Sequence, residues 1–513
     1  MISFIISLVA LLGGYFIYGR YVERIFGPDD RQTPAVAMAD GVDYIKLPNW
    51  KVFMIQFLNI AGTGPIFGSI MGAWYGPWAY LWIVLGCIFA GSVHDYFMGM
   101  LSVRHGGASL PEIIREYLGN NAKRVLLVFT CFLLIMVGVV FVYSPALILG
   151  DMFPKTSMFS GVLLWIIVIF LYYVLATLMP IDKIIGKFYP IFAFALLFMA
   201  AALMICLFIK MPALPELWSN LQDSNLNNPK SILGTDTFIQ KNPLFPALFL
   251  TIACGAISGF HATQSPLMAR CIGSEKMGRK IFYGSMITEG VVALIWATVS
   301  AYFFYYGGWR EVCDPVVVNN FLEQSGKPEG KSLVQYFTAP QVVEIICSGW
   351  LGTFGAIIAI LGVVAAPITS GDTALRSARL IIAEALGMEQ RTIVKRLLIA
   401  IPMFIASILL LVWQIENPNG FNTIWQYFGW ANQTLSVFSL WTITIYLTQR
   451  KKPFIITLIP ALFMTMICST FLFVSQQAFG MDYRLGVCLG VLLVVGALVL
   501  FLVKFRSLYG SAK

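Results

Sequence analysis

Long apolar runs alternate with short polar segments along the whole of this 513-residue chain. Thirteen of these runs come close to the length of about 20 residues that a helix needs to cross a membrane. We therefore predict an all-α polytopic membrane protein with about thirteen transmembrane helices. The predicted spans are 1–18, 51–72, 76–101, 125–149, 159–179, 188–209, 244–266, 281–306, 345–369, 394–414, 421–446, 453–475 and 484–504.

Two of these runs are interrupted near their centres by glycine and proline. The first contains AGTGPIFGS at 61–69, and the second contains GAISGFHATQSP at 255–266. Glycine and proline destabilise helices, and in lipid every backbone group that a break releases needs a partner. Such breaks are tolerated where the backbone lines a cavity inside the protein, so two discontinuous helices are predicted. For either stretch alone, a kinked helix with close neighbour packing is the alternative.

The interrupted runs begin two sets of five predicted spans, at 51–209 and 244–446. With alternating spans, the first interrupted helix enters from the opposite side of the membrane to the second. This arrangement predicts a 5+5 inverted repeat whose two discontinuous helices meet at mid-membrane depth. The remaining parts are an extra N-terminal span and cytoplasmic loop at 1–50, an outer loop at 210–243, and two C-terminal spans with a cytoplasmic tail at 447–513.

The basic residues set the predicted orientation. The chain is 58% hydrophobic and 12% charged, with a mean hydropathy of +0.80 and a formal net charge of +9. Of its 34 lysine and arginine residues, 26 fall on one side of the predicted spans. This asymmetry places that side in the cytoplasm, the N-terminus outside and the C-terminus inside. The positive charge therefore indicates membrane orientation, and no nucleic-acid partner is predicted.

The sequence contains no motif that predicts an enzyme. It has three histidines, no HExxH, no Walker A sequence and no GxGxxG. We therefore predict neither catalytic residues nor an organic cofactor.

Several stretches carry a resemblance to a known family. They are GPIFGSIMGAWYGPWAYLWIVLGCIFAGSVHDYFMGMLSVRHGG, GAISGFHATQSP followed by MARC, TSGDTALRSARL and FGWANQTLS. The chain resembles the shorter members of the carbon starvation protein CstA family of bacterial inner-membrane transporters. The resemblance implies the LeuT-like fold of the amino acid–polyamine–organocation superfamily and a part in the response to carbon starvation. It also implies uptake of pyruvate or short peptides driven by the proton gradient, and leaves the choice between these substrates open.

The two interruptions supply the candidate substrate site. The first residues after a break are a half-helix N-terminus, whose amides and positive dipole end attract a carboxylate. Polar side chains near the breaks and in the eleventh span complete the set, although their hydroxyls can instead bond within their own helices and their amides can join two helices. The candidates are Gly62, Thr63, Gly64, Pro65, Ser258, Gly259, Phe260, His261, Gln264, Asn432 and Gln433.

Ionisable residues inside the spans are the candidates for proton coupling, because charges are costly in a membrane and are functional hypotheses by default. They are His94, Asp95, His261 and Glu289. Asp95 has two predicted partners, a protonated His94 and a basic residue such as Arg104, although adjacent helical residues need not bond to each other. For His94 and Asp95 the alternative is a structural charge near the interface. For His261 it is a neutral histidine bonded to a carbonyl, and the role of Glu289 stays similarly open.

The end of the ninth span gathers oxygen ligands at Thr369, Ser370 and Asp372. Oxygen-rich clusters suit hard cations. In transporters of similar architecture, hydroxyls at the matching place help to hold sodium, so Thr369 and Ser370 are candidates for a sodium site or a proton-using remnant of one. For Asp372 we favour the alternative of an N-cap for a basic helix from Thr373 to Leu386.

These observations together predict a secondary active transporter that imports a small carboxylate nutrient, pyruvate or short peptides, by alternating access. Protons are favoured over sodium as the coupling ion. The alternatives are a membrane channel, a nutrient sensor and a sodium-coupled amino-acid symporter. The predicted partners are the substrate and the lipid bilayer, and no oligomeric state is predicted.

Overall fold

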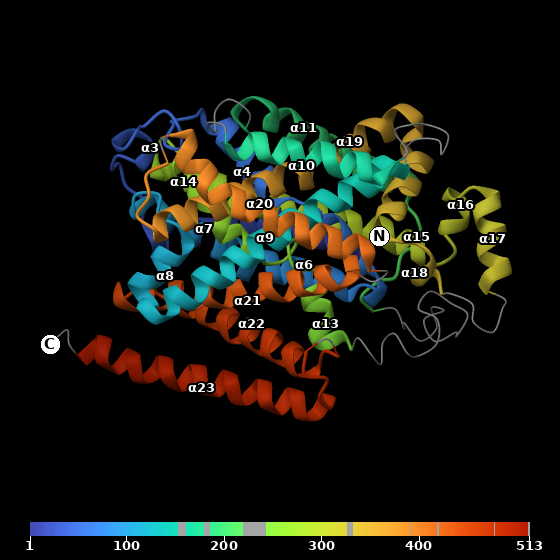
Figure 1. Ribbon diagram of the computed structural model, residues 1–513. Helices are drawn as coiled ribbons and strands as arrows, with labels where there is room; N and C mark the ends of the chain where they lie inside the picture. Colours follow the sequence, from blue (N-terminus) through green and yellow to red (C-terminus); the bar gives the residue numbers. More distant parts are fainter. Residues whose placement is uncertain are drawn as a thin grey trace.

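The computed structural model describes residues 1–151, 161–178, 185–218, 243–325, 332–390, 392–417, 420–476 and 478–510. Every regular element in these ranges is a helix, which confirms the all-α prediction (Figure 1). The predicted outer loop at 210–243 lies mostly outside the described residues. The predicted division of the chain into repeats is not tested and stays a prediction.

Nine helices in the described ranges are long and apolar enough to cross a membrane, or ten if the first interrupted helix is counted as one span. The nine are Ile2–Phe26 (α1, η1 and α2), Trp78–Arg104 (α6, η4 and α7), Asn120–Gly150 (in α9), Tyr189–Lys210 (in α11), Glu275–Phe304 (η6, η7 and α15), Gly355–Ala385 (in α19), Ile393–Glu416 (α20), Ile455–Val474 (α22) and Tyr483–Phe505 (in α23).

The other predicted spans are helical but do not meet this test of length and composition. They contain α10 (Val162–Leu178), the pair α13 (Leu244–Thr251) and α14 (Gly259–Ala269), and α21 (Gly420–Gln449). The count of thirteen and the inverted repeat therefore stay predictions.

Burial separates central helices from peripheral ones. In the most apolar window of Glu275–Phe304, 89% of the residues are buried, against 17% for Tyr483–Phe505. Figure 1 shows α22 and α23 (Tyr483–Gly510) packed together along one edge of the molecule, with α23 outermost. The site described below therefore belongs to the inner helices, and the α22–α23 pair covers their flank.

Both predicted interruptions are present, but the second lies earlier than the predicted stretch 255–266, because residues 259–266, with Pro266, belong to a helix. α4 (Asn49–Ile60) ends before residues 61–63, and the chain resumes in η2 (Gly64–Gly68) and α5 (Ser69–Gly72) at an angle of 54°. α13 ends at Thr251, and seven non-helical residues, 252–258, separate it from α14.

Glycine allows the two interrupted helices to touch. A Cβ atom on Gly64 would overlap the Cys254 side chain of the second break, and one on Gly68 would lie 2.6 Å from the carbonyl oxygen of Thr251. Real Cβ atoms do not approach backbone this closely, so these positions require glycine. The two breaks predicted from separate stretches therefore form one structural centre.

α19 (Ala339–Ala385) corrects one prediction. The helix passes through Asp372 and Thr373 without interruption, so Asp372 does not cap a new helix. The Ser-Gly-Asp sequence has another use, because Gly371 packs directly against the Tyr173 hydroxyl of α10. Close packing by glycine explains this motif better than helix capping.

Candidate functional site

All the residues predicted to bind substrate or couple ions are buried. They come from the two breaks, η2, α7 (Ser92–Arg104), α14, α15 (Gly284–Phe304), α19 and α21. Packing of α14 against α4, α7, α19 and α21 makes the second interrupted helix their common neighbour.

Four buried ionisable side chains form a continuous chain beside the second break. Asp95 makes hydrogen bonds with two imidazoles. Its Oδ1 lies 2.8 Å from His94 Nδ1, and its Oδ2 lies 2.8 Å from His261 Nδ1. His261 Nε2 lies 3.5 Å from Glu289 Oε2. This buried chain, as we call it, joins α7, α14 and α15 across three separate stretches of sequence.

The partners of Asp95 differ in part from the prediction. His94 does bond to its own neighbour, although adjacent helical residues usually point apart. Arg104 does not reach Asp95, because its guanidinium pairs with Glu275 at 3.1 Å. The second imidazole, from His261, takes the place that the sequence had suggested for a basic residue.

The far end of the buried chain is open to a further partner. Neither oxygen of Glu289 has a hydrogen-bond donor among the described residues, and the same holds for the Nε2 atoms of His94 and His261. A buried carboxylate without a donor is costly unless it carries a proton or meets a cation, a ligand or water. Glu289 therefore keeps its hydrogen-bonding capacity for a proton, a cation, a ligand or water.

Asn432 holds the start of α14. Its Oδ1 accepts from the Phe260 backbone N–H at 2.7 Å and from the Ser258 hydroxyl at 3.0 Å. The amide of Phe260 is thus occupied in this conformation, which corrects the expectation that it is free for a substrate carboxylate. Asn432 therefore joins α21 to the start of α14, which is one of the two roles predicted for it.

The first break keeps unpaired polar groups. Thr63 Oγ1 has no hydrogen-bond partner among the described residues, and the same is true of both amide atoms of Gln56 and of Asn59. Gln56 and Asn59 are three residues apart and share one side of α4, and Thr63 follows in the break. Gln56 and Asn59 are absent from the predicted site. The signal in the sequence that points to them is a pair of amide side chains three residues apart in an apolar run.

The residues predicted for sodium divide between two roles. The Ser370 hydroxyl donates to the carbonyl of Leu58, 3.0 Å away in the last turn of α4, and so touches the first interrupted helix. The Thr369 hydroxyl donates to carbonyls of its own helix, those of Ala365 and Ala366. Asp372 Oδ2 instead accepts from the Tyr189 hydroxyl at 2.5 Å.

Each of the two predicted glutamines, Gln433 and Gln264, donates one side-chain hydrogen bond. Gln433 Nε2 donates to the carbonyl of Phe249 at 3.3 Å, and Gln264 Nε2 donates to the Thr263 hydroxyl at 2.9 Å. Both side-chain oxygens remain without a donor in the described part of the chain. These amides therefore keep acceptor capacity at the centre of the protein.

The sequence comparison identifies the family. The model of the family "Carbon starvation protein CstA" matches residues 1–151 and 136–471. The chain belongs to the carbon starvation protein CstA family.

Relatives of this CstA-family chain include named transporters. A membrane protein of Haemophilus influenzae is 46% identical over 59% of this chain and 91% of its own length. The peptide transporter CstA of Escherichia coli is 26% identical over 94% of this chain and 81% of its own length. The pyruvate/proton symporter BtsT of Escherichia coli is 28% identical over 56% of this chain and 47% of its own length.

Solved transporters share the fold. A manganese transporter of Eremococcus coleocola aligns with a TM-score of 0.54 at 13% identity, covering 92% of this chain and 99% of its own. A sodium-coupled sialic acid symporter aligns with a TM-score of 0.50 at 13% identity, covering 97% of this chain and 96% of its own. The CstA and BtsT relatives and both structural neighbours are transporters and not enzymes, so this CstA-family chain is a multi-pass membrane transport protein.

Proposed function

We propose that this protein is a secondary active transporter of the bacterial inner membrane that imports pyruvate or short peptides together with protons by alternating access. The substrate classes and the coupling ion come from the names of the CstA and BtsT relatives, a peptide transporter and a pyruvate/proton symporter. The predicted positions of the buried polar residues agree with this proposal.

The contact between the two interrupted helices is the observation that carries the proposal. Transporters of this kind open to one side at a time by rocking or gating of one repeat against the other around a site between two interrupted helices. Gly64 against Cys254 brings the two breaks together at the centre of the inner helices. A substrate bound there is within reach of both halves of both helices.

The first break offers the groups for the substrate. Thr63 Oγ1, Gln56 Nε2 and Asn59 Nδ2 are buried donors without acceptors among the described residues. A carboxylate supplies four acceptor positions, so it satisfies several of these donors at once. The donors replace the water that the carboxylate loses on entering the protein.

The buried chain is the proposed proton carrier. A proton that arrives at Glu289 or at His261 Nε2 allows these two side chains to share a hydrogen bond at the position where they now lie 3.5 Å apart. That bond ties α14 to α15 on one side, and Asp95 ties α14 to α7 on the other. Proton binding would thereby favour one packing of the second interrupted helix over the other.

The test is uptake into proteoliposomes. Labelled pyruvate and a labelled dipeptide are offered separately, with an inward proton gradient, an inward sodium gradient or no gradient. We expect saturable uptake of one substrate that the proton gradient stimulates and a protonophore abolishes. Stimulation by sodium alone would replace the proton with sodium, a result that the Ser370 contact to α4 would support. Absence of gradient-stimulated uptake of both substrates would contradict the proposal.

A further inference from the structure

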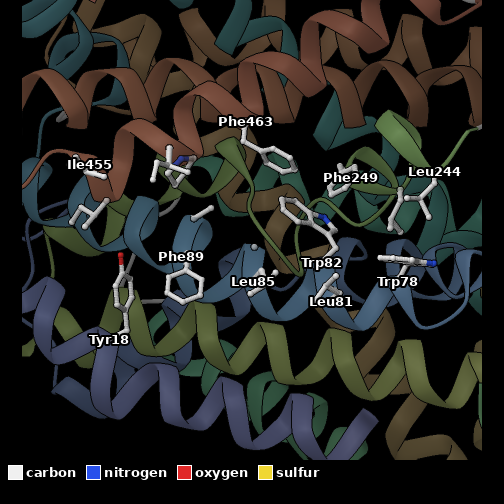
Figure 2. Close-up of a pocket in the computed structure, with 16 residues that line it drawn as sticks. Tyr18, Trp78, Leu81, Trp82, Leu85, Phe89, Leu244, Phe249, Ile455 and Phe463 are labelled. Atoms are coloured by element: carbon white, nitrogen blue, oxygen red, sulfur yellow. The ribbon is translucent and has the colours of Figure 1, made fainter. Parts of the chain in front are cut away.

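An apolar cavity of about 550 Å³ lies on the flank of the second interrupted helix (Figure 2). Four parts of the chain line it, namely η1 (Gly14–Tyr18), α6 (Trp78–Gly86) with η4 (Cys87–Gly91), α13, and α22. Aromatic and aliphatic side chains make up the wall, among them Trp78, Leu85, Phe89, Phe249, Ile455 and Phe463.

This cavity faces the hydrocarbon region. Leu85 is 45% exposed, Phe89 43% and Ile459 63%, and all three belong to helices long and apolar enough to cross a membrane. Among the residues that the structure describes, no lysine, arginine, aspartate or glutamate lines the cavity. An occupant must therefore present an aliphatic surface, as the acyl chain of a membrane lipid does.

One end of the cavity lies next to basic residues. Tyr18 and Ile455 lie near each other at one end of the wall in Figure 2. Tyr18 is followed by α2 (Gly19–Phe26), and Ile455 begins α22 just after the loop at 450–452. Lys452 Nζ donates to the Phe26 carbonyl at 2.7 Å, so α2 and this loop meet.

The charge at this end is positive and largely uncompensated. Exposed side chains of α2 and the loop include Arg20, Arg24, Arg450 and Lys451, and none of them lies within 4.0 Å of a carboxylate of the described residues. The intervening Glu23 is held by Arg279 at 2.7 Å. Burial, together with Arg104 and Arg450, lowers the pKa of Lys452, as expected where cations gather. This end is on the side predicted to be cytoplasmic.

We propose that the cavity binds an anionic membrane phospholipid, with an acyl chain along α6 and α22 and its phosphate among the basic residues of α2 and the 450–452 loop. The apolar wall fits the chain, and the cluster of cations fits the phosphate. Each basic residue near a membrane surface adds to the attraction of anionic lipid. The combination selects anionic over zwitterionic lipids.

The same wall reaches the second break. Trp82 Nε1 donates to the carbonyl of Ile252, the first residue after α13, at 2.9 Å. The Trp82 ring also packs edge-on against Phe249 of α13, with 4.9 Å between centroids. An acyl chain lying on these two rings stabilises the present position of α13, so the bound lipid supports one position of the second interrupted helix.

The experiment measures the lipid retained by the full chain. The protein is equilibrated in detergent with an equimolar mixture of phosphatidylglycerol and phosphatidylcholine, purified, and analysed for bound lipid by mass spectrometry. We expect preferential retention of phosphatidylglycerol. Leu85→Trp, which fills the cavity, and the double variant Arg450→Gln/Lys451→Gln should each lower this retention at least about fivefold.

Matched controls keep the result interpretable. Leu500→Trp places the same bulk on an exposed position of α23, and Arg484→Gln removes a charge at the other end of the same helix pair, so both should retain the lipid as the unaltered chain does. Equal retention of both lipids would overturn the proposal, and so would retention that neither cavity nor loop variants change. The measurement needs no transport, so its failure is distinct from failure of the proposed function.

Discussion

At the scale of single residues, the buried chain is the feature with the clearest chemical consequence. Asp95 lies between two imidazoles at 2.8 Å each, and Glu289 stands at the end without a hydrogen-bond donor among the described residues. Buried charges are costly, because each of them loses its hydration. Ionisable residues inside a membrane protein are therefore functional hypotheses by default. Glu289 accepts no hydrogen bond from the described residues, so replacement by the neutral isostere glutamine removes its charge and leaves the hydrogen bonds of Asp95 in place.

Glu289→Gln should separate coupling from substrate movement. The amide keeps the size of the side chain but cannot take up a proton from a gradient. We expect proton-driven uptake to fall at least about tenfold, as loss of a proton-transfer group does, while exchange of labelled for unlabelled substrate at equal pH continues. Glu416→Gln, at the exposed end of α20, is the control. Unaltered proton-driven uptake in Glu289→Gln would remove this residue from the coupling mechanism.

Asn432→Ala should weaken the start of α14. The variant leaves the Phe260 N–H and the Ser258 hydroxyl without their shared acceptor, which costs about 1–3 kcal/mol for a buried group. We expect a lower thermal unfolding temperature in detergent and slower uptake of substrate. Asn417→Ala, an exposed position that bonds within its own turn, should change neither value. A normal unfolding temperature for Asn432→Ala would show that the helix start is held in another way.

At the scale of elements, contact between the two breaks depends on residues that have no side chain. Gly64 lies directly against Cys254, and Gly68 lies against the Thr251 carbonyl. Small residues allow helices to approach closely in membranes, where van der Waals packing drives association. The interrupted helices therefore act together because the first can come within backbone distance of the second.

Gly64→Ala should disrupt this contact, and the loss should be partly reversible. The added methyl group overlaps the Cys254 side chain, and overpacking of this kind costs about 1–3 kcal/mol. We expect reduced uptake and a lower unfolding temperature, with partial recovery when Cys254→Gly is added. Gly13→Ala, at a position with open space around it, is the control. A double variant no better than Gly64→Ala would contradict the proposed contact.

The sequence predicts the features that a local pattern reveals. It does not predict the contacts that depend on how distant helices pack. Glycine and proline inside an apolar run gave both breaks, and the rarity of charge in such runs gave His261 and Glu289. The Asn432 contact with the start of α14 depends on where α21 packs, and no local pattern contains that information. The supposed cap at Asp372 failed because Gly371 serves packing against Tyr173, a residue about two hundred positions away.

At the scale of the whole molecule, the chain combines a shared fold with its own arrangement of polar groups. The fold is that of solved manganese and sialic acid transporters at 13% identity, so their cargo says nothing about the cargo here. Family membership and the buried residues support the import of a small carboxylate. Direction of import depends on the predicted orientation, which rests on the asymmetry of the basic residues.

Orientation is open to direct labelling. Tyr306→Cys lies at an exposed position after α15, and Lys451→Cys lies in the loop before α22. We expect a membrane-impermeant maleimide to label Tyr306→Cys in intact cells, and Lys451→Cys only after the cells are opened, each compared with the unsubstituted chain. The reverse pattern would invert the predicted topology and the direction of import.

The proposed import of pyruvate or a short peptide together with protons is tested by measuring substrate entry and proton entry in the same vesicles. Proteoliposomes that carry the purified chain and an internal pH dye receive labelled pyruvate, and in parallel a labelled dipeptide, with no imposed gradient. We predict that one of the two substrates enters saturably and acidifies the interior in proportion to its uptake, and that the Glu289→Gln variant loses the acidification. Saturable uptake with no proton entry in the unaltered chain would contradict the account.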